Sequence, residues 1–338
     1  MTEVVSDGRY SRQERFAPIG MAGQQRLRHA TAVVVGCGAL GTAQLDQLVR
    51  AGVGTVRLID RDFVEASNLQ RQGLYDEADA AACTPKAIAA AARLGRINAQ
   101  VRLEPLVTEV GPRNVERLIA GVDVVLDGTD NFRTRHLLNE ACVRARIPWI
   151  YGACVGAYGL ALAIVPGTTP CLACLQDQLP GPGETPTCDT AGVIAPIVQL
   201  VAAWQVVDAL RLLTGAAPRR NLWTCDLWAD RFQQVDVARW RDPSCAVCGP
   251  VPTWPRLHEQ AEPAITLCGR DSVQLTGVKI DLGGLPARVG AALVAANEYL
   301  VRWRDGERLV TAFRDGRVLV QGVADGAAAR TVVDRWLG

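Results

Sequence analysis

The sequence GCGALG is the first place along the chain where residue types and spacing point to chemistry. It supplies Gly36, Gly38 and Gly41 directly after the apolar stretch TAVVV. Glycines let the backbone approach a phosphate closely, and the start of the following helix attracts negative charge. Asp60, nineteen residues after Gly41, ends the next apolar stretch and is placed to bind ribose hydroxyls. The combination predicts a nucleotide site, although a glycine motif alone also fits a tight turn without a ligand.

The polar stretch SNLQRQ, residues 67–72, supplies more donors than a dinucleotide such as NAD needs. A triphosphate carries more charge than a pyrophosphate, so it requires donors beyond the glycine turn. Asn68, Arg71 and Gln72 follow the ribose acid, and Lys86 lies near the start of a helix. Arg presents a planar fork to phosphate oxygens and Lys a point charge. Such residues are usually solvated when they stand alone, but their gathering at strand ends favours a triphosphate.

Asp130 ends a later apolar stretch, in DGTDN, and is suited to hold a magnesium ion that bridges the phosphates. The polar residues Asp62 and Asn131 lie close to the two acids in sequence and are assigned to the same predicted site. None of the three histidines lies in a recognisable catalytic setting, which disfavours an NAD-dependent dehydrogenase.

Four of the eleven cysteines form two C-x-x-C pairs, Cys171 with Cys174 and Cys245 with Cys248. The spacing inside each pair suits tetrahedral zinc. Since seventy residues separate the pairs, the metal would join two distant loops. Four thiolates leave no position for a catalytic water, so the predicted zinc is structural. A redox disulfide or a chance pattern is the alternative.

Composition bounds the class of protein. The 338 residues suggest about two domains, and 49% hydrophobic with 21% charged residues is typical of a globular protein. Lys plus Arg number 36 and Asp plus Glu 35, so the chain has no large excess of positive charge for binding nucleic acid or a membrane. The polar N-terminus is unlike a signal peptide, and an odd cysteine count without such a signal favours the cytoplasm.

The apolar run at residues 195–215 contains Gln199, Gln205, Asp208 and Arg211. Four such groups are unusual in a membrane span, so the run predicts a buried helix of a soluble protein.

Strands and helices alternate over the first half of the chain. We expect a helical arm over 9–29, strands in TAVVV, GTVRLID, QVRLEPL and VDVVLDGTD, and helices over about 39–49, 84–98 and 131–145. Strands that alternate with helices predict a doubly wound parallel sheet. The expected fold class is therefore α/β, with a Rossmann-like, mostly parallel sheet that antiparallel strands continue after residue 156.

The second half has a different pattern. The Pro- and Gly-rich stretch from Pro170 to Cys188 predicts a mobile loop, and strands return in LWTCDLWADRFQQVDV. Residues 251–264 carry three prolines and indicate a linker. Residues 265–338 predict a small α+β module with a short strand, a helix near 285–296, two or three strands and a final helix. The expected domains are thus 1–250, the linker 251–264, and the module 265–338.

Several motifs together resemble the ThiF/MoeB family, the bacterial relatives of ubiquitin-activating enzymes. They are RYSRQ, GCGALG, AGVGTVRLIDRDFVEASNLQRQ, PKA, DGTDNFRTR, TCDTAGVIAP and the two C-x-x-C pairs. The resemblance covers about residues 9–250. Ala39 departs from a family pattern that often has a second glycine there, while three glycines remain. The C-terminal module resembles the tail of some ThiF-type proteins of Gram-positive bacteria.

The resemblance implies an adenylyltransferase. It would use ATP and Mg²⁺ to adenylate the C-terminal carboxylate of a ubiquitin-like sulfur carrier protein that ends in Gly-Gly. The acyl-adenylate would then become a thiocarboxylate, in thiamin thiazole or molybdopterin synthesis, with a cysteine desulfurase or another sulfur donor as a further partner. A homodimer is also implied. No protein base is required, because a carboxylate is already ionised at neutral pH.

The family motifs also imply roles for particular residues. Gly36, Gly38, Gly41 and Asp60 would hold the nucleotide, Asn68, Arg71, Gln72 and Lys86 its phosphates, Asp130 the magnesium ion, and Arg12 would reach the active site of the partner subunit. The implied catalytic residues are Arg12, Arg71, Lys86, Asp130 and Cys188.

Cys188, in GETPTCDTAG, precedes the long helix that is expected from about residue 195. A thiol near a helix N-terminus and a cationic site has a lowered pKa, and the resemblance implies a role in acyl or sulfur transfer. The alternative is a bystander, since adenylation itself needs no thiol. Two other functions stay open for the whole chain: an NAD-dependent oxidoreductase, and a non-catalytic carrier-binding relative.

Overall fold

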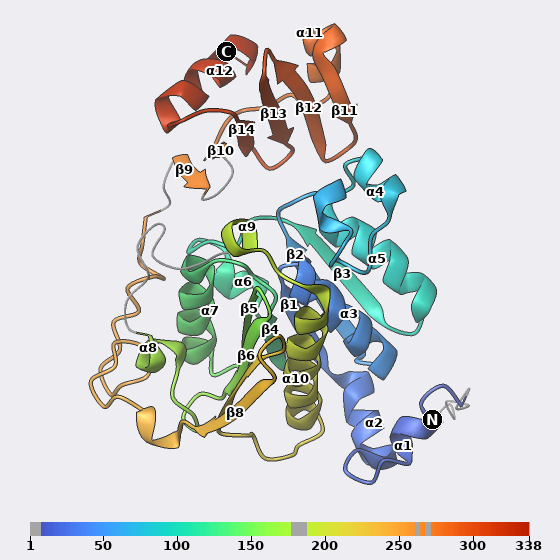
Figure 1. Cartoon of the computed structure of the whole chain (residues 1–338), viewed down its shortest axis with the longest axis vertical. Helices are drawn as coiled ribbons and strands as arrows, with labels where there is room; N and C mark the ends of the chain where they lie inside the picture. Colours follow the sequence, from blue (N-terminus) through green and yellow to red (C-terminus); the bar gives the residue numbers. More distant parts are fainter. Residues whose placement is uncertain (1–7, 177–187, 261–263, 268–271, 338) are drawn as a thin grey trace. The chain divides into compact units, whose positions relative to one another are not determined.

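The computed structural model describes residues 8–176, 188–260, 264–267 and 272–337 (Figure 1). The chain divides into two compact units, the larger drawn from residues 1–259 and the smaller mainly from residues 260–338. The two units are described separately below. The stretch 177–187, most of the loop predicted as mobile, lies outside the described residues.

In the part of the chain that the structure describes, the larger unit is built on an eight-stranded sheet with the order β3-β2-β1-β4-β5-β6-β7-β8. The strands are β1 (Thr31–Val35), β2 (Thr55–Asp60), β3 (Arg102–Val107), β4 (Val124–Asp127), β5 (Trp149–Val155), β6 (Tyr158–Ile164), β7 (Asn221–Asp226) and β8 (Arg231–Asp236). The pairs among β3, β2, β1, β4 and β5 are parallel, and β6, β7 and β8 continue the sheet antiparallel. The predicted fold class is confirmed.

Helices cover both faces of this sheet (Figure 1). They are α1 (Ser11–Glu14), α2 (Gly20–His29), α3 (Ala39–Ala51), α4 (Glu77–Ala81), α5 (Lys86–Ile97), α6 (Val115–Leu118), α7 (Phe132–Ala145), α8 (Leu172–Leu175), α9 (Cys188–Ala191) and α10 (Ala195–Leu213). Strand β1 shows why two layers form. Its residues Ala32 and Val34 belong to one core with apolar residues of α3, α5 and α10, while Val33 and Val35 belong to a second core with apolar residues of α7. Alternate residues of a strand point to opposite faces, so an apolar strand needs cover on both sides.

Among the described residues, one helix, α10, is long enough and apolar enough to cross a membrane, judged by length and composition alone. It packs against α3, β5 and β6. Its polar residue Gln205 is fully buried and donates from Nε2 to the carbonyl oxygens of Asp127 and Ile150, at 2.9 and 3.0 Å. The helix therefore lies in the core of the larger unit, as its polar residues predicted.

The smaller unit contains, among its described residues, a six-stranded antiparallel sheet with the order β11-β12-β13-β14-β10-β9. Its elements are β9 (Ala264–Leu267), β10 (Ser272–Leu275), α11 (Leu285–Val289), β11 (Leu293–Ala296), β12 (Leu300–Asp305), β13 (Arg308–Phe313), β14 (Val318–Gln321) and α12 (Gly326–Leu337). The core includes Trp303, Val310 and Val332. A helix running to residue 296 was a wrong prediction. Helix α11 ends at Val289 because Gly290 takes a positive φ of 51°, and β11 follows after one short 3-10 turn.

Candidate functional site

The glycine turn, residues 36–41, follows β1, and its backbone packs against the backbone of the loop that follows β4. Gly36 follows β1 with φ of +91°, and a Cβ on it would come within 2.5 Å of the carbonyl oxygen of Gly128, directly after β4. Gly41, in the first turn of α3, leaves even less room, since a Cβ there would lie 1.8 Å from the Gly36 oxygen. Strands β1 and β4 are neighbours whose chain connections leave in opposite directions, which is where open α/β sheets bind nucleotides.

Asp60 holds this turn in shape from the end of β2. Its two carboxylate oxygens accept hydrogen bonds from the backbone N–H of Cys37, at 2.6 Å, and of Asp62, at 2.7 Å. Burial raises the pKa of Asp60, and the positive charge of Lys86 opposes that shift. Tyr75 supports the same turn by donating its hydroxyl to the Cys37 carbonyl oxygen at 2.7 Å. No motif pointed to Tyr75 from the sequence.

Lys86, the first residue of α5, is held near the glycine turn by two contacts with Asp62. Its backbone N–H donates to the Asp62 carbonyl oxygen at 2.9 Å, and its Nζ lies 3.8 Å from Asp62 Oδ2. Only about a tenth of the Lys86 side chain is exposed, whereas Asp62 is half exposed. The structure therefore brings Asp60, Asp62 and Lys86 together beside the glycine turn.

The residues of SNLQRQ have different local roles. Asn68 is buried and caps a short 3-10 turn (Ala66–Asn68), since its Oδ1 accepts from the Glu65 N–H at 3.1 Å. Arg71 is half-buried and donates from Nη1 to the Ser67 carbonyl oxygen at 2.8 Å. Gln72 is 4% exposed, its amide nitrogen approaches Gly38, and its buried Oε1 has no partner among the described residues. A buried amide without a partner next to the glycine turn fits a site that a ligand completes.

Asp130 stands exposed in the turn between β4 and α7. The next residue, Asn131, caps α7 by accepting the Thr134 N–H at 2.9 Å, and its amide nitrogen lies 3.5 Å from Asp130 Oδ1. Asp130 also interacts electrostatically with Arg61 and Arg135. An exposed carboxylate at the carboxyl end of a parallel strand has the oxygen chemistry that Mg²⁺ prefers.

A buried ion pair fixes the turn that carries Asp130. Arg135, on α7, donates from Nε to Asp127 Oδ2 at 3.0 Å and from Nη2 to the Thr129 carbonyl oxygen at 2.7 Å. Asp127 Oδ1 accepts from both the backbone N–H and the hydroxyl of Thr129, at 2.9 and 2.7 Å. Burial raises the pKa of Asp127, and Arg135 opposes that shift. Sequence reasoning missed this pair, although both residues stand in the quoted motif DGTDNFRTR.

Arg12 lies at the other end of α3 from the glycine turn. It is exposed on α1, where the next residue, Gln13, donates to the carbonyl oxygen of Ala51, the last residue of α3, at 2.9 Å. A helix of that length spans about 20 Å. Within one chain, the structure therefore does not bring Arg12 to the other predicted site residues.

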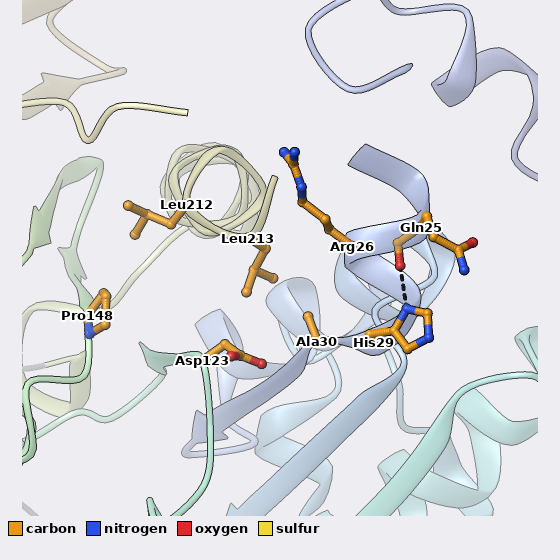
Figure 2. Close-up of a pocket in the computed structure, with 8 residues that line it drawn as sticks. All are labelled: Gln25, Arg26, His29, Ala30, Asp123, Pro148, Leu212 and Leu213. Carbon is orange, nitrogen blue, oxygen red and sulfur yellow. Dashed lines mark hydrogen bonds between the residues drawn. The ribbon is translucent and has the colours of Figure 1, made fainter. Parts of the chain in front are cut away.

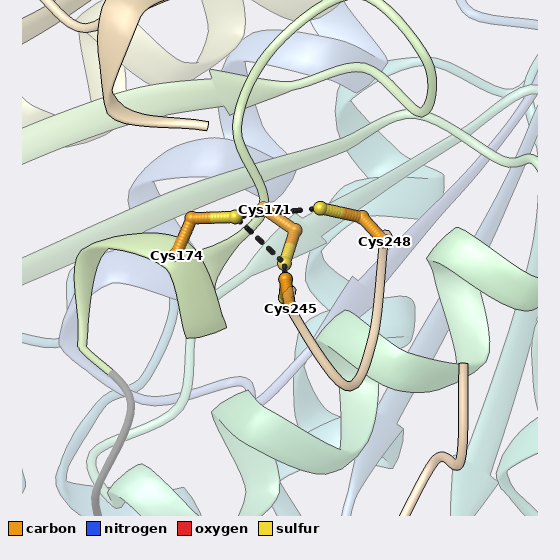
Figure 3. Close-up of side chains that lie close together, drawn as sticks. All are labelled: Cys171, Cys174, Cys245 and Cys248. Carbon is orange, nitrogen blue, oxygen red and sulfur yellow. Dashed lines mark hydrogen bonds between the residues drawn. The ribbon is translucent and has the colours of Figure 1, made fainter. Parts of the chain in front are cut away.

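The four cysteines predicted to bind metal converge although they come from two distant loops (Figure 3). Their sulfur atoms all lie within 4.8 Å of one another, with Cys171–Cys245 at 3.6 Å, Cys174–Cys248 at 3.3 Å and Cys171–Cys174 at 3.9 Å. None of the described cysteines forms a disulfide. A tetrahedral zinc site with Zn–S bonds of about 2.3 Å places its sulfurs about 3.8 Å apart, so the four side chains fit such an ion.

Cys188 is the first residue of α9, and the segment after this helix is tied to the turn between β5 and β6. Gly156 donates to the Gly192 carbonyl oxygen at 2.8 Å and accepts from the Ile194 N–H at 3.0 Å. The Cys188 side chain lies outside the described residues, so its predicted exposure and surroundings stay a prediction.

A separate hollow of about 500 Å³ lies at the opposite end of the sheet (Figure 2). Ala30, Asp123 and Pro148, which line it, stand just before β1, β4 and β5. His29 faces it with its ring bonded to the Gln25 carbonyl oxygen at 2.8 Å. Open α/β sheets bind ligands at the carboxyl ends of their strands, so this hollow is distinct from the predicted nucleotide site.

Comparisons with known proteins agree with the predicted resemblance. The ThiF family model matches residues 10–247. The chain is 47% identical over 337 residues to the Sulfur carrier protein ThiS adenylyltransferase of Bacillus subtilis (strain 168), which covers 98% of this chain and 99% of that protein. It is 36% identical over 245 residues to the Molybdopterin-synthase adenylyltransferase of Salmonella typhimurium, which covers 71% of this chain and 96% of that protein.

Solved structures share the fold of the larger unit. The structure of E. coli MccB with MccA-N7isoASN superimposes with a TM-score of 0.62 at 22% identity and covers 72% of this chain and 75% of that one. The structure of E. coli MccB with ATP gives a TM-score of 0.61 at 21% identity, again covering 72% and 75%. From the extent of the family match and the identity to these relatives, the chain belongs to the ThiF family.

Proposed function

We propose that this protein is an ATP-dependent adenylyltransferase that activates the C-terminal glycine carboxylate of a ubiquitin-like sulfur carrier protein. The observation that carries the proposal is that the glycine turn, with Asp60 and Lys86 beside it, lies against the turn after β4 that carries Asp130. The identity to a ThiS adenylyltransferase over nearly the whole chain supports it. The same likeness favours a carrier of the ThiS kind, hence thiazole rather than molybdopterin synthesis. An oxidoreductase and a non-catalytic relative lose support.

The proposed reaction is a displacement at phosphorus. A carboxylate oxygen of the carrier attacks the α-phosphorus of ATP, the bond to the β-phosphate oxygen breaks, and pyrophosphate leaves as the acyl-adenylate forms. Negative charge on the phosphate oxygens rises during this step, so fixed positive groups lower the barrier. Lys86 and Arg71 are the proposed cations, and the glycine turn supplies backbone N–H groups at the start of α3.

Two metal ions complete the proposal. Asp130, with Asn131 beside it, would hold Mg²⁺, which when bound neutralises charge on the phosphates. Zn²⁺ would be bound by the four cysteines, with a structural role because thiolates occupy all four positions. The ATP would be held by Gly36, Gly38, Gly41 and Asp60, with Asp62, Asn68 and Gln72 around it.

We propose a cytoplasmic homodimer in which Arg12 of each chain reaches the nucleotide of the other. The location of α1 at the far end of α3 supports this arrangement. Residues 1–250 would form the adenylyltransferase domain and 265–338 a small module joined by residues 251–264. A cysteine desulfurase or another sulfur donor would act after adenylation, and Cys188 is proposed to take part in that later acyl or sulfur transfer.

Asp130→Ala should lower carrier-dependent exchange of labelled pyrophosphate into ATP by about 100-fold or more, because the phosphates would lose their proposed metal ligand. Asp123→Ala is the matched control, since Asp123 stands just before β4 at its other end and accepts the Thr31 N–H. Normal exchange in the Asp130 variant would remove this residue from the mechanism.

Zinc analysis of freshly purified, reduced protein should find about one zinc per chain. Cys171→Ser should lose that metal, whereas Cys225→Ser should retain it, because Cys225 is buried on β7 outside the sulfur cluster. Wild-type protein without zinc would rule out the proposed metal.

Mixing inactive Arg12→Ala chains with inactive Asp130→Ala chains should restore activity after subunit exchange. One site of each mixed dimer would combine an intact Asp130 with an intact Arg12, so about a quarter of all sites would recover at equal mixing. Each variant incubated with itself is the control. A mixture that stays at the level of the single variants would mean that Arg12 does not act across the dimer.

Cys188→Ser should keep pyrophosphate exchange but slow formation of the carrier thiocarboxylate, because only the later transfer would use the thiol. Mass spectrometry of the carrier measures the second step. Thiocarboxylate formation at the wild-type rate would identify Cys188 as a bystander.

A further inference from the structure

Helix α7 touches the cysteine cluster through one buried amide. Asn139 is fully buried, and its Oδ1 accepts a hydrogen bond from the backbone N–H of Leu172 at 2.9 Å. Leu172 is the first residue of α8 and directly follows Cys171, whose own carbonyl oxygen accepts the Cys174 N–H at 3.1 Å. A bond from α7 therefore fixes the backbone of the loop that carries the first C-x-x-C pair.

The nitrogen of the same amide, Nδ2, is buried and has no hydrogen-bond partner among the described residues. The bond from Asn139 Oδ1 to Leu172 holds this side chain one residue from Cys171. A buried N–H donor without a partner is unfavourable, and a metal-bound thiolate is a strong acceptor that a neutral thiol is not. The unmet donor therefore matches the form that Cys171 takes when it binds a metal.

The position of Asn139 on α7 gives this contact a further consequence. Arg135 is one turn earlier on the helix, and residues four apart lie on the same helix face. Arg135 fixes the turn that carries Asp130 through Asp127 and Thr129. One rigid helix thus holds the cysteine cluster with one side chain and the turn at the nucleotide site with another.

We propose that Asn139 is a positioning residue of the metal site. Its Nδ2–H donates to the Cys171 thiolate when zinc is bound, while its Oδ1 holds the Leu172 N–H. Groups that bond to metal ligands in this way commonly change metal affinity by about 10- to 100-fold. The inference rests on the zinc site proposed above and does not depend on the adenylation reaction.

The test is the rate at which the zinc-loaded full-length chain gives up zinc to an excess of a chromophoric chelator. Asn139→Asp keeps an oxygen for the Leu172 N–H but replaces the donor by a negative charge. It should release zinc about tenfold faster or more, and Asn139→Ala should do the same. The matched control is Asn98→Asp, because Asn98 is also buried and its amide bonds at both ends, to Tyr10, Val49 and Gln100, away from the cysteines.

Three outcomes decide the matter. Fast release from both Asn139 variants, with wild-type release from Asn98→Asp, supports the proposal. Release from Asn139→Asp at the wild-type rate overturns it, because the bond to Leu172 would then be the whole role of the amide. A wild-type chain that binds no zinc overturns the metal site and this inference together.

A second measurement keeps the proposal testable if Asn139→Asp does not fold. Cobalt(II) in place of zinc gives a sulfur-to-metal charge-transfer band, and an N–H donor to the thiolate raises the energy of that band. In cobalt-loaded Asn139→Ala the band should move to longer wavelength than in the wild-type chain. An unchanged band would overturn the proposal.

Discussion

The buried pair of Asp127 and Arg135 is the interaction on which the predicted nucleotide site depends. Asp127 ends β4 at the centre of the sheet and is fully buried; its Oδ1 accepts from Thr129 in the turn that follows, and its Oδ2 accepts from Arg135 on α7. A buried carboxylate is costly unless it is paired and hydrogen-bonded, and here the guanidinium and Thr129 supply those partners. Removing Arg135 would leave that charge uncompensated. The pair therefore fixes the direction in which the chain leaves β4, and with it the place of Asp130.

Helix α7, which supplies Arg135, also bonds to other segments of the larger unit. Besides Arg135 and Asn139, it presents Glu140, whose buried carboxylate accepts the Leu257 N–H at 2.9 Å. Arg133 lies 3.3 Å from Glu259, so the chain after the second C-x-x-C pair is held along the same helix. Charged hydrogen bonds of this kind are stronger than neutral ones. The stretch expected as a linker is thus packed against α7 at least as far as residue 259.

Much of this organisation follows from patterns that local physics produces. The sequence predicted the apolar strands and the glycine turn because each depends on residues that are neighbours in sequence. It also predicted the paired cysteines, because their spacing suits one kind of ligand, a metal ion. The roles of Tyr75, Gln205 and Asn139 were not predicted, because each acts on a backbone group far away in sequence, and a lone polar residue has the same appearance in a sequence whether it is solvated or buried. The helix predicted near 285–296 was too long because Gly290 takes a positive φ and turns the chain towards β11.

The distribution of positive charge around the glycine turn points to an incomplete site in a single chain. Lys86 lies beside Asp62, whose negative charge offsets part of the charge of Lys86. Arg71 already donates one hydrogen bond, from Nη1, to the Ser67 carbonyl oxygen. Arg135 is committed to Asp127. A triphosphate that is losing pyrophosphate demands more compensation than these residues leave. In the proposed homodimer, the exposed Arg12, on a short helix anchored at the far end of α3, would supply that charge from the second copy of the chain. The proposed dimer would thereby link catalysis to assembly, since each site would be complete only when two chains meet.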